Sequence, residues 1–395
     1  MSQASATPLK KTALNQTHRA LKAKMVDFGG WDMPVEYPGF TPRQQGSAVG
    51  GPGAGGGLIA EHLAVRTAVG LFDVSHMGEI RFRGAGALAA VQAITMNDAA
   101  RLKIGQAHYS ALLTPTGCYV DDILVHKLAD DDYLLVVNAG TKDKDFAWIV
   151  DHVGGRPDAQ IEDLSAQYSQ IAVQGPRALE TLQKLTSTDL KAIKNYWFTF
   201  GAVAGVENVL IARTGYSGED GFEVYVPSDE PTTVGVWKAL FAAGEEFGIR
   251  PCGLGARNTL RLEAGMPLYG HEISDTVNVF EAGLEHWLKL DKGEFVGREA
   301  LRAVVAAGGP QRKLISLEMV ERGIGRDGYS VLSLSGEEIG RITSGSPAPF
   351  LKKNIAFAMV SAAVAASGED VLVEVRGNRV RAKQVPAPFY KRSKK

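Results

Sequence analysis

Apolar and polar residues alternate with a period of two over several short runs of the chain, and each such run predicts a strand. Tyr119–Lys127 is one of them, and the apolar run Tyr133–Asn138 is its expected antiparallel partner. Helices are expected over Lys142–Val153, which follows directly, and earlier over Thr12–Lys24 and Leu58–Val69. The mixture of strands and helices predicts an α+β fold.

A hairpin is the clearest local prediction. Val209–Thr214 and Phe222–Val226 are rich in β-forming residues, and Asp220-Gly221 closes a turn between them. The second arm alternates, so its phenylalanine and valines should share one face and leave Glu223 on the other.

The last quarter of the chain changes character after Gly308-Gly-Pro310. Short β-rich runs are separated there by glycine, serine and proline turns, which predicts an all-β terminal domain, either a sandwich or a barrel. The runs are Lys313–Glu318, Tyr329–Leu334, Glu338–Ser344, Ile355–Val360, Asp370–Arg376 and Arg379–Val385.

Two adjacent carboxylates stand inside Tyr119–Lys127, although acidic residues are usually depleted in strands. Successive side chains point to opposite faces, so Asp121 and Asp122 are expected not to share a site. One interpretation is that both acids decorate a solvated strand start. The other is that one carboxylate lies in a pocket, where it takes or places a proton. The residues alone leave both interpretations open.

Composition narrows the class of protein. The chain has 395 residues, 45 % of them hydrophobic, which suits a globular protein of two or three domains. Its 43 basic and 44 acidic residues give a formal net charge of −1, so no global field favours nucleic acid or an anionic membrane. No apolar run approaches the roughly 20 residues that span a bilayer. Met1–Lys11 is too short and weakly apolar for a signal or transit peptide, so a cytoplasmic location is expected.

Motifs for metal, phosphate or serine nucleophile chemistry are missing from the sequence. Cys118 and Cys252 lack a CxxC spacing, and the eight histidines show no HExxH spacing, so no metal is expected. Ser75 and His76 are neighbours in the expected strand Leu71–Phe82 and should point in opposite directions. No GxSxG elbow occurs either, so serine-type hydrolysis is not expected.

A Gly-rich run over Pro38–Gly55 has few large apolar residues. It cannot bury enough surface to offset an ordering cost of about 1–2 kcal/mol per residue. Gly51, Gly53 and Gly56 formally match a dinucleotide fingerprint, but no strand precedes them, which favours a chance match. We therefore expect a mobile surface loop whose ends, at Tyr37 and Gly56, lie close together and whose removal changes stability and activity little.

Two arginines, Arg257 and Arg261, lie one turn apart on an expected helix over Pro251–Gly265. Neither has an acid four residues away, so they form either a surface patch or an anchor for an anionic or carbonyl-rich ligand.

Several short segments form a recognisable series along the chain. They are Met25–Phe28 with Gly30-Trp31, Phe72–Met77, Val120–Asp122, Arg213–Tyr216, Gly218–Glu223, Cys252–Arg257 with Leu260–Ala264, and Thr343–Gly345. In this order they resemble the aminomethyltransferase (T-protein) family of the glycine cleavage system. The resemblance covers about Thr12 to Tyr390, apart from the Gly-rich run. It implies a three-lobed ring around a central folate pocket, formed by a folate-binding region at 12–287 with a flexible insertion at about 38–55, and a C-terminal β-barrel domain at 310–390.

The resemblance also implies a reaction. The family moves the methylene carbon of an aminomethyl group from the lipoyl arm of the H-protein to tetrahydrofolate. The products are 5,10-methylenetetrahydrofolate, ammonia and the dihydrolipoyl arm. Tetrahydrofolate as co-substrate, the H-protein as partner and no metal are therefore implied, with no nucleic acid and no membrane.

Residue by residue, Asp122 matches the family's catalytic aspartate, which positions the folate amine and assists proton movement as the carbon–sulfur bond breaks. Glu223 matches the acceptor of the pterin N–H groups, and Arg257 a substrate-contacting arginine. Four further residues fall on pocket positions: Tyr109, Asn138, Tyr216 and Met77.

Two single-residue departures bear on the pocket. His126 stands where relatives often carry an aromatic residue, and Asn258 stands where the pattern usually has aspartate. Two alternatives share the scaffold: a folate-dependent demethylase or methyltransferase with another one-carbon donor, and a folate-binding iron–sulfur assembly factor. The second carries a cysteine in a Lys-Gly-Cys stretch, and Lys292–Glu299 has Glu294 in its place, which argues against it.

Overall fold

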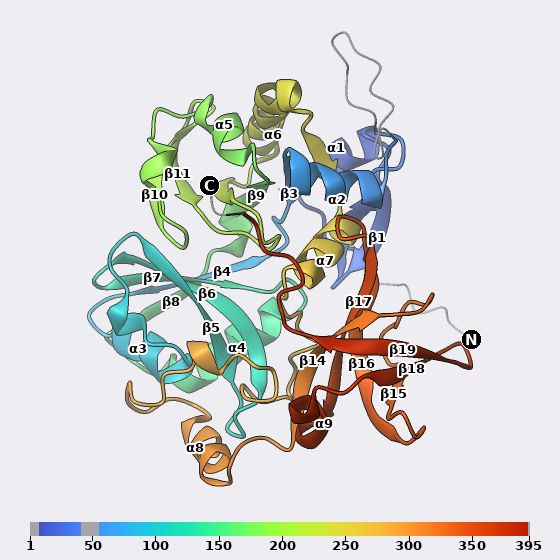
Figure 1. The fold of residues 1–395 in the computed structure, drawn as a ribbon. Helices are drawn as coiled ribbons and strands as arrows, with labels where there is room; N and C mark the ends of the chain where they lie inside the picture. The colour runs from blue at the N-terminus through green and yellow to red at the C-terminus, as the bar shows by residue number, and fades with distance from the viewer. Residues whose placement is uncertain (1–7, 41–54, 394–395) are drawn as a thin grey trace, which may run out of the picture. The chain divides into compact units, whose positions relative to one another are not determined.

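The computed structural model describes residues 8–40 and 55–393, whose helices and strands are labelled in Figure 1. The chain forms two compact units. The first unit combines the chain up to Met77 with Ser165–Gly215 and Glu219–Arg257. The second combines Gly78–Leu164 with Tyr216–Gly218 and Asn258–Lys395. Both units mix helices and strands, which confirms the predicted fold class.

A six-stranded sheet in the order β10-β11-β12-β9-β3-β13 forms the centre of the first unit. In this sheet β13 pairs in parallel with β3, and the other neighbours are antiparallel. The strands are β3 (Gly70–Asp73), β9 (Tyr168–Gln174), β10 (Phe198–Val203), β11 (Val206–Ala212), β12 (Gly221–Pro227) and β13 (Arg250–Cys252); β1 (Lys24–Phe28) and β2 (Trp31–Glu36) form a separate antiparallel pair.

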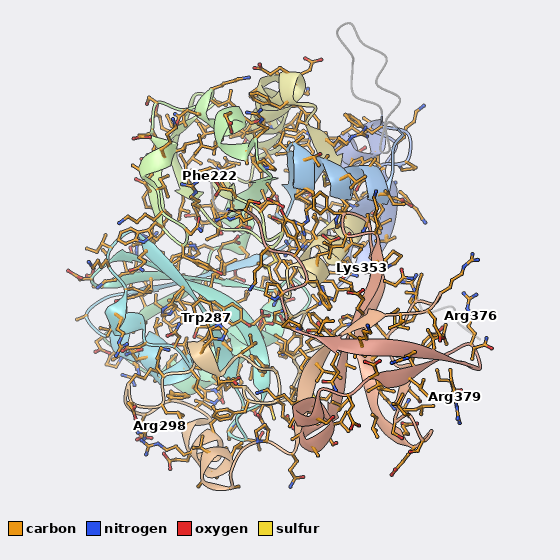
Figure 2. All side chains as sticks on the ribbon, viewed as in Figure 1. Phe222, Trp287, Arg298, Lys353, Arg376 and Arg379 are labelled. Atoms are coloured by element: carbon orange, nitrogen blue, oxygen red, sulfur yellow. The ribbon has the colours of Figure 1, made fainter. Side chains whose placement is uncertain are left out.

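The helices of the first unit are α1 (Asn15–Ala20), α2 (Leu58–Thr67), α5 (Ala178–Gln183) and α6 (Glu230–Gly244), and α7 (Leu254–Glu263) continues into the second unit. Sequence dictates the start of α6, because the Asp229 side chain accepts a hydrogen bond from the Thr232 N–H and a proline occupies the first turn. Trp237 and Leu240 of α6 are buried in one apolar cluster with Phe222 of β12, which is labelled in Figure 2.

The predicted hairpin is confirmed, because β11 and β12 are antiparallel neighbours with Ala212 opposite Glu223. The predicted faces are confirmed too. Phe222, Val224 and Val226 lie in the apolar core of the first unit, whereas the Glu223 carboxylate binds polar side chains.

The second unit contains an antiparallel five-stranded sheet in the order β5-β6-β7-β4-β8. Its strands are β4 (Gly78–Arg83), β5 (Gln106–Leu113), β6 (Tyr119–Ala129), β7 (Asp132–Val137) and β8 (Gln160–Asp163). Helices α3 (Ala87–Ile94) and α4 (Lys142–Val153) share an apolar core with this sheet. The expected pairing of the acidic strand with the next strand is therefore confirmed, and α4 has the predicted bounds.

A closed six-stranded barrel forms the C-terminal part of the second unit (Figure 1). Each of the six β-rich runs contributes one strand, and the barrel interior is the apolar cluster that includes Leu317, Val331 and Val373. The strands are β14 (Arg312–Met319), β15 (Ser330–Leu332), β16 (Glu338–Ala348), β17 (Lys353–Ser361), β18 (Val371–Val375) and β19 (Asn378–Val385), with helices α8 (Arg298–Ala306) before and α9 (Ala362–Ser367) within the barrel sequence.

Two predicted elements are wrong. The helix predicted over Thr12–Lys24 is observed only as the shorter α1. At its start, the Thr12 hydroxyl donates to Asp73 Oδ2 at 2.6 Å instead of capping the helix, and at its end Lys24 already begins β1. The single strand Leu71–Phe82 is two strands, β3 and β4, which belong to different sheets. The turn between them contains Ser75 and His76, so alternation along a strand does not decide where these two side chains point.

The two ends of the Gly-rich run belong to the described residues. The part over 41–54, with most of the fingerprint match, lies outside them. The Gly57 N–H donates to the Tyr37 carbonyl at 3.0 Å, which confirms that the two ends of the run lie close together. The buried Arg250 guanidinium donates through Nη1 to the carbonyls of Phe40, at 3.4 Å, and Gly55, at 3.0 Å.

This anchoring changes the expected effect of a deletion. Replacing residues 41–54 by two glycines keeps the Phe40 and Gly55 carbonyls that Arg250 binds, so we expect a nearly unchanged melting temperature. Removing the whole of Pro38–Gly55 takes both carbonyls from a buried cation and should cost about 1–3 kcal/mol of stability. Thermal unfolding of the two deletion variants checks this, and equal melting temperatures would contradict the role of Arg250.

Candidate functional site

The two acids of β6 share one hydrogen-bond donor, Asn138, which follows directly after β7. Its Nδ2 lies 2.8 Å from Asp122 Oδ1 and 2.9 Å from Asp121 Oδ1. The expectation that the acids do not share a site is therefore wrong. Alternation fixes the face from which each side chain leaves the strand, but an amide at the end of the neighbouring strand reaches both carboxylates.

Asp121 is fully buried, so a solvated strand start is the wrong interpretation for this residue. Its Oδ2 accepts hydrogen bonds from the Asn138 backbone N–H at 2.9 Å and from the Thr141 hydroxyl at 3.0 Å. Thr141, just before α4, was not among the predicted site residues. These donors hold a carboxylate in a place where an unpaired charge would be costly.

Asp122 is half-buried, and its Oδ2 accepts a hydrogen bond from the Tyr109 hydroxyl at 3.1 Å. Burial first, and then the charge of Asp121, raise the pKa of Asp122 to about 7, although hydrogen bonds from Asn138 and Tyr109 lower it. Burial and the charge of Asp122 also raise the pKa of Tyr109, so this hydroxyl stays protonated. Asp122 can therefore both accept and release a proton near neutral pH.

Tyr109 is held in place by a second aromatic residue. Its ring lies 5.6 Å from that of Trp287, centroid to centroid and at a tilt of 50°. Trp287 is labelled in Figure 2. This packing leaves the Tyr109 hydroxyl to point at Asp122.

Glu223 is the centre of the candidate site in the first unit. It is buried, its Oε1 accepts a hydrogen bond from Gln170 Nε2 at 3.0 Å, and its Oε2 accepts one from the Thr214 hydroxyl. Gln170 Nε2 also donates to the Tyr225 hydroxyl at 3.1 Å. Burial raises the pKa of Glu223, while the Thr214 and Gln170 hydrogen bonds and the charge of Arg257 lower it. Gln170 and Thr214 were missed, although Gln170 is a polar residue directly before the apolar residues Ile171–Val173 of β9.

The two arginines of α7 have different roles. They therefore form neither a common surface patch nor a common ligand anchor. Arg257 is half-buried, and its positive charge lowers the pKa of both Glu223 and His76. Arg261 is buried, with Nη1 2.7 Å from Glu272 Oε2 and Nη2 2.7 Å from the Ser344 hydroxyl. Arg261 therefore forms a structural ion pair with Glu272 within the second unit. The ligand-anchor hypothesis is retained for Arg257 alone.

The remaining predicted residues lie in turns. Met77 is half-buried, and its backbone N–H donates to the Val74 carbonyl at 3.1 Å. Tyr216 is half-buried too, and its hydroxyl donates to the Pro267 carbonyl. The structure thus brings Asp122, Tyr109 and Asn138 together within the second unit and places Glu223 and Arg257 in the first unit.

Ser75 and His76 do not form a nucleophile–base pair. The Ser75 hydroxyl donates to the Gln170 carbonyl at 3.3 Å and accepts from the Gln170 N–H at 3.1 Å. The His76 ring packs edge-on against Phe28, and burial, followed by the charge of Arg257, lowers its pKa to about 4.

Over residues 8–40 and 55–393, no group of three or more histidine, cysteine, aspartate or glutamate side chains could hold a metal ion. No helix in the same ranges is both long enough and apolar enough to cross a bilayer.

Comparison with known proteins gives one consistent family. Residues 14–292 match the family described as the GCVT N-terminal domain, and residues 312–391 match the glycine cleavage T-protein C-terminal barrel domain. A curated relative from Acidobacterium capsulatum, named aminomethyltransferase, is 60 % identical over 100 % of both chains. One of the same name from Geobacillus thermodenitrificans is 45 % identical over 98 % of this chain and 100 % of its own.

A solved structure agrees with these matches. The crystal structure of the glycine cleavage system aminomethyltransferase T from Bartonella henselae superimposes with a TM-score of 0.86 at 30 % identity. The match covers 97 % of this chain and 98 % of that one.

The shared amide generates a prediction for Asp121→Asn. Removing the charge beside Asp122 should lower the pKa of Asp122 below its value of about 7. It should also weaken the hydrogen bonds that residue 121 accepts from Asn138 and Thr141, which should lower the free energy of unfolding by about 1–3 kcal/mol. Titration of the Asp122 carboxyl carbon by NMR and chemical denaturation check the two effects.

The matched control is Asp130→Asn, an exposed acid in the turn after β6, which should leave both quantities unchanged. Because the pKa of Asp122 is raised on folding, its contribution to stability is complete below about pH 4 and is lost as pH rises through about 7. In Asp121→Asn this loss should occur at lower pH, and an unchanged titration would contradict the assigned coupling.

Proposed function

The chain belongs to the glycine cleavage T-protein family of aminomethyltransferases, and we propose that it moves the methylene carbon of an aminomethyl group from the lipoyl arm of an H-protein to tetrahydrofolate. Ammonia, 5,10-methylenetetrahydrofolate and the dihydrolipoyl arm are the products. The observation that carries the proposal is Asp122, a carboxyl group with a pKa of about 7 held between the Tyr109 hydroxyl and the Asn138 amide.

Tetrahydrofolate, when bound, supplies the amine nitrogens that accept the one-carbon unit. In this proposal Asp122 holds the attacking amine in place and takes up the proton that the amine loses. Asp122 suits this task because its pKa near neutrality lets it exchange a proton in either direction. Tyr109 and Asn138 keep the carboxyl group oriented, since each donates to a different oxygen.

Glu223 is the proposed acceptor for the adjacent N–H donors on the pterin edge. Each of its oxygens receives one internal hydrogen bond, from Gln170 or Thr214, and a carboxylate oxygen can accept a second. The positive charge of Arg257 favours the ionised, acceptor-only form of Glu223. These features fit a planar pair of donors, which a carboxylate binds through both oxygens.

The remaining assignments are part of the same proposal. Arg257 would contact a carbonyl or anionic part of the folate, and Tyr216, as a pocket position, and Met77, as a wall residue, stay predictions from the family resemblance. The domain bounds 12–287 and 310–390, the cytoplasmic location and the lack of a resident metal stay predictions. The family matches over 14–292 and 312–391 support the bounds.

Donor choice separates this proposal from the related folate-dependent demethylases. A steady-state assay with tetrahydrofolate should show turnover with an aminomethylated H-protein and none with methylated small molecules. The iron–sulfur assembly alternative has no support at Lys292–Glu299, where Glu294 is exposed and pairs with Arg298 in the place of a cysteine.

We expect Asp122→Asn to lower turnover by about 10² or more, the usual scale for acid–base contributions. The amide keeps the shape of the carboxylate, so folding and folate affinity should be retained. Single-turnover kinetics with aminomethylated H-protein give the rate, and calorimetric titration with tetrahydrofolate gives the affinity. Wild-type turnover in Asp122→Asn would exclude Asp122 as the proton acceptor.

Glu223→Gln should weaken tetrahydrofolate binding by about 1–3 kcal/mol, because an amide accepts only one of two adjacent donors and presents its own N–H to the other. Calorimetric titration measures this change. Glu207→Gln is the matched control, an exposed glutamate on the partner strand β11 that should bind folate like the wild type. Equal affinities of the two variants would remove Glu223 from the folate site.

A further inference from the structure

A third carboxyl group, that of Asp145, is a neighbour of Asp121 on β6. Asp145 is in the first turn of α4, its side chain has 0 % exposure, and its backbone N–H donates to the Thr141 carbonyl at 2.8 Å. Thr141 contacts both acids, because its carbonyl accepts the Asp145 N–H and its hydroxyl donates to Asp121 Oδ2 at 3.0 Å, and the two carboxyl groups interact with each other. Neither carboxyl oxygen of Asp145 receives a hydrogen bond from any donor among the described residues.

Two ionised carboxylates in contact would have no donor between them and would repel each other in a buried place. Asp121 already accepts hydrogen bonds from Asn138 and Thr141, whereas Asp145 accepts none. A proton on Asp145 removes the repulsion, and it also supplies an O–H···O⁻ hydrogen bond to Asp121, one of the stronger kinds of hydrogen bond in proteins.

The charged and polar groups that face Asp145 do not replace this proton. The Lys144 ammonium lies 3.7 Å from Asp145 Oδ1, but it is half exposed and donates to the Val120 carbonyl and the Tyr269 hydroxyl. Burial, the charge of Asp121 and the hydrogen bond to Asp121 raise the pKa of Asp145 to about 9, and Lys144 and Thr141 only reduce the rise.

We propose that Asp145 is a positioning residue that acts as a buried carboxylic acid: it donates its proton to Asp121, so the pair carries one negative charge, and this charge orients the Asn138 amide against Asp122. The role of the pair in proton transfer at Asp122 rests on the function proposed above. The shared proton itself does not, because it follows from burial and contact.

Stability as a function of pH tests the shared proton without any activity measurement. A carboxyl group with a raised folded-state pKa stabilises the fold fully below about pH 4, and this contribution is lost as pH rises through about 9. Asp145→Asn keeps a donor toward Asp121 and cannot titrate. The melting temperature of Asp145→Asn minus that of the wild type should therefore grow steadily between pH 5 and pH 9 and then level off.

The control for this series is Asp151→Asn on the same helix, because the Asp151 side chain is 86 % exposed and its variant should follow the wild-type curve at every pH. A difference between Asp145→Asn and wild type that stays constant above pH 5 would show that Asp145 is ionised like an ordinary aspartate. That result would overturn the proposal whatever the activity of the enzyme.

Turnover tests the positioning role. Asp145→Leu removes the donor and should lower kcat about tenfold, the scale of one hydrogen bond to a charged group, with unchanged folate affinity. Asp145→Asn should restore kcat because it restores the donor. Equal kcat values in the two variants would overturn the positioning role. If the wild type has no aminomethyl-transfer activity, the proposed function fails, and the pH series still decides the shared proton.

Discussion

The buried negative charge on β6 is the constraint on which the arrangement of the second unit depends. A carboxylate taken out of water must be hydrogen-bonded or neutralised. The fold meets this requirement with the segment between β7 and α4, where the Asn138 amide, the Asn138 N–H and the Thr141 hydroxyl all point at the β6 acids. The β6–β7 register therefore does more than build the sheet, because it delivers the donors that make an internal acid possible.

Asp122 and Glu223 show two outcomes of the same balance. Burial is the largest effect on both, and it raises the pKa of each. The neighbouring charge differs in sign, because it is negative for Asp122, from Asp121, and positive for Glu223, from Arg257. Asp122 is thereby suited to proton exchange, and Glu223 is suited to remain an acceptor. Two carboxylates in one chain acquire separate tasks from their surroundings.

Local patterns predicted the parts of the fold that local forces decide. The β11–β12 hairpin and the barrel strands follow from alternation and turn residues, both of which are short-range. The helix over Thr12–Lys24 failed because the Thr12 hydroxyl binds Asp73, 61 residues away. The shared site of Asp121 and Asp122 was missed for the same reason, since its donor, Asn138, comes from the residue that follows the next strand. Asp145 gave one signal, an acid early in a predicted helix, but sequence does not show which early acids are buried.

The two departures from the family pattern, Asn258 and His126, have little effect on the charge balance around Arg261 and Asp122. Asn258 is exposed, and its Oδ1 accepts a hydrogen bond from Arg261 Nε at 2.9 Å, a contact that an aspartate oxygen would make equally well. The charge of Arg261 is already balanced by Glu272, so an amide suffices at position 258. His126 is fully buried, and burial lowers its pKa to about 4, so the ring is neutral at physiological pH. A neutral imidazole can take the place of a neutral aromatic ring without adding a charge to the face of β6 that carries Asp122.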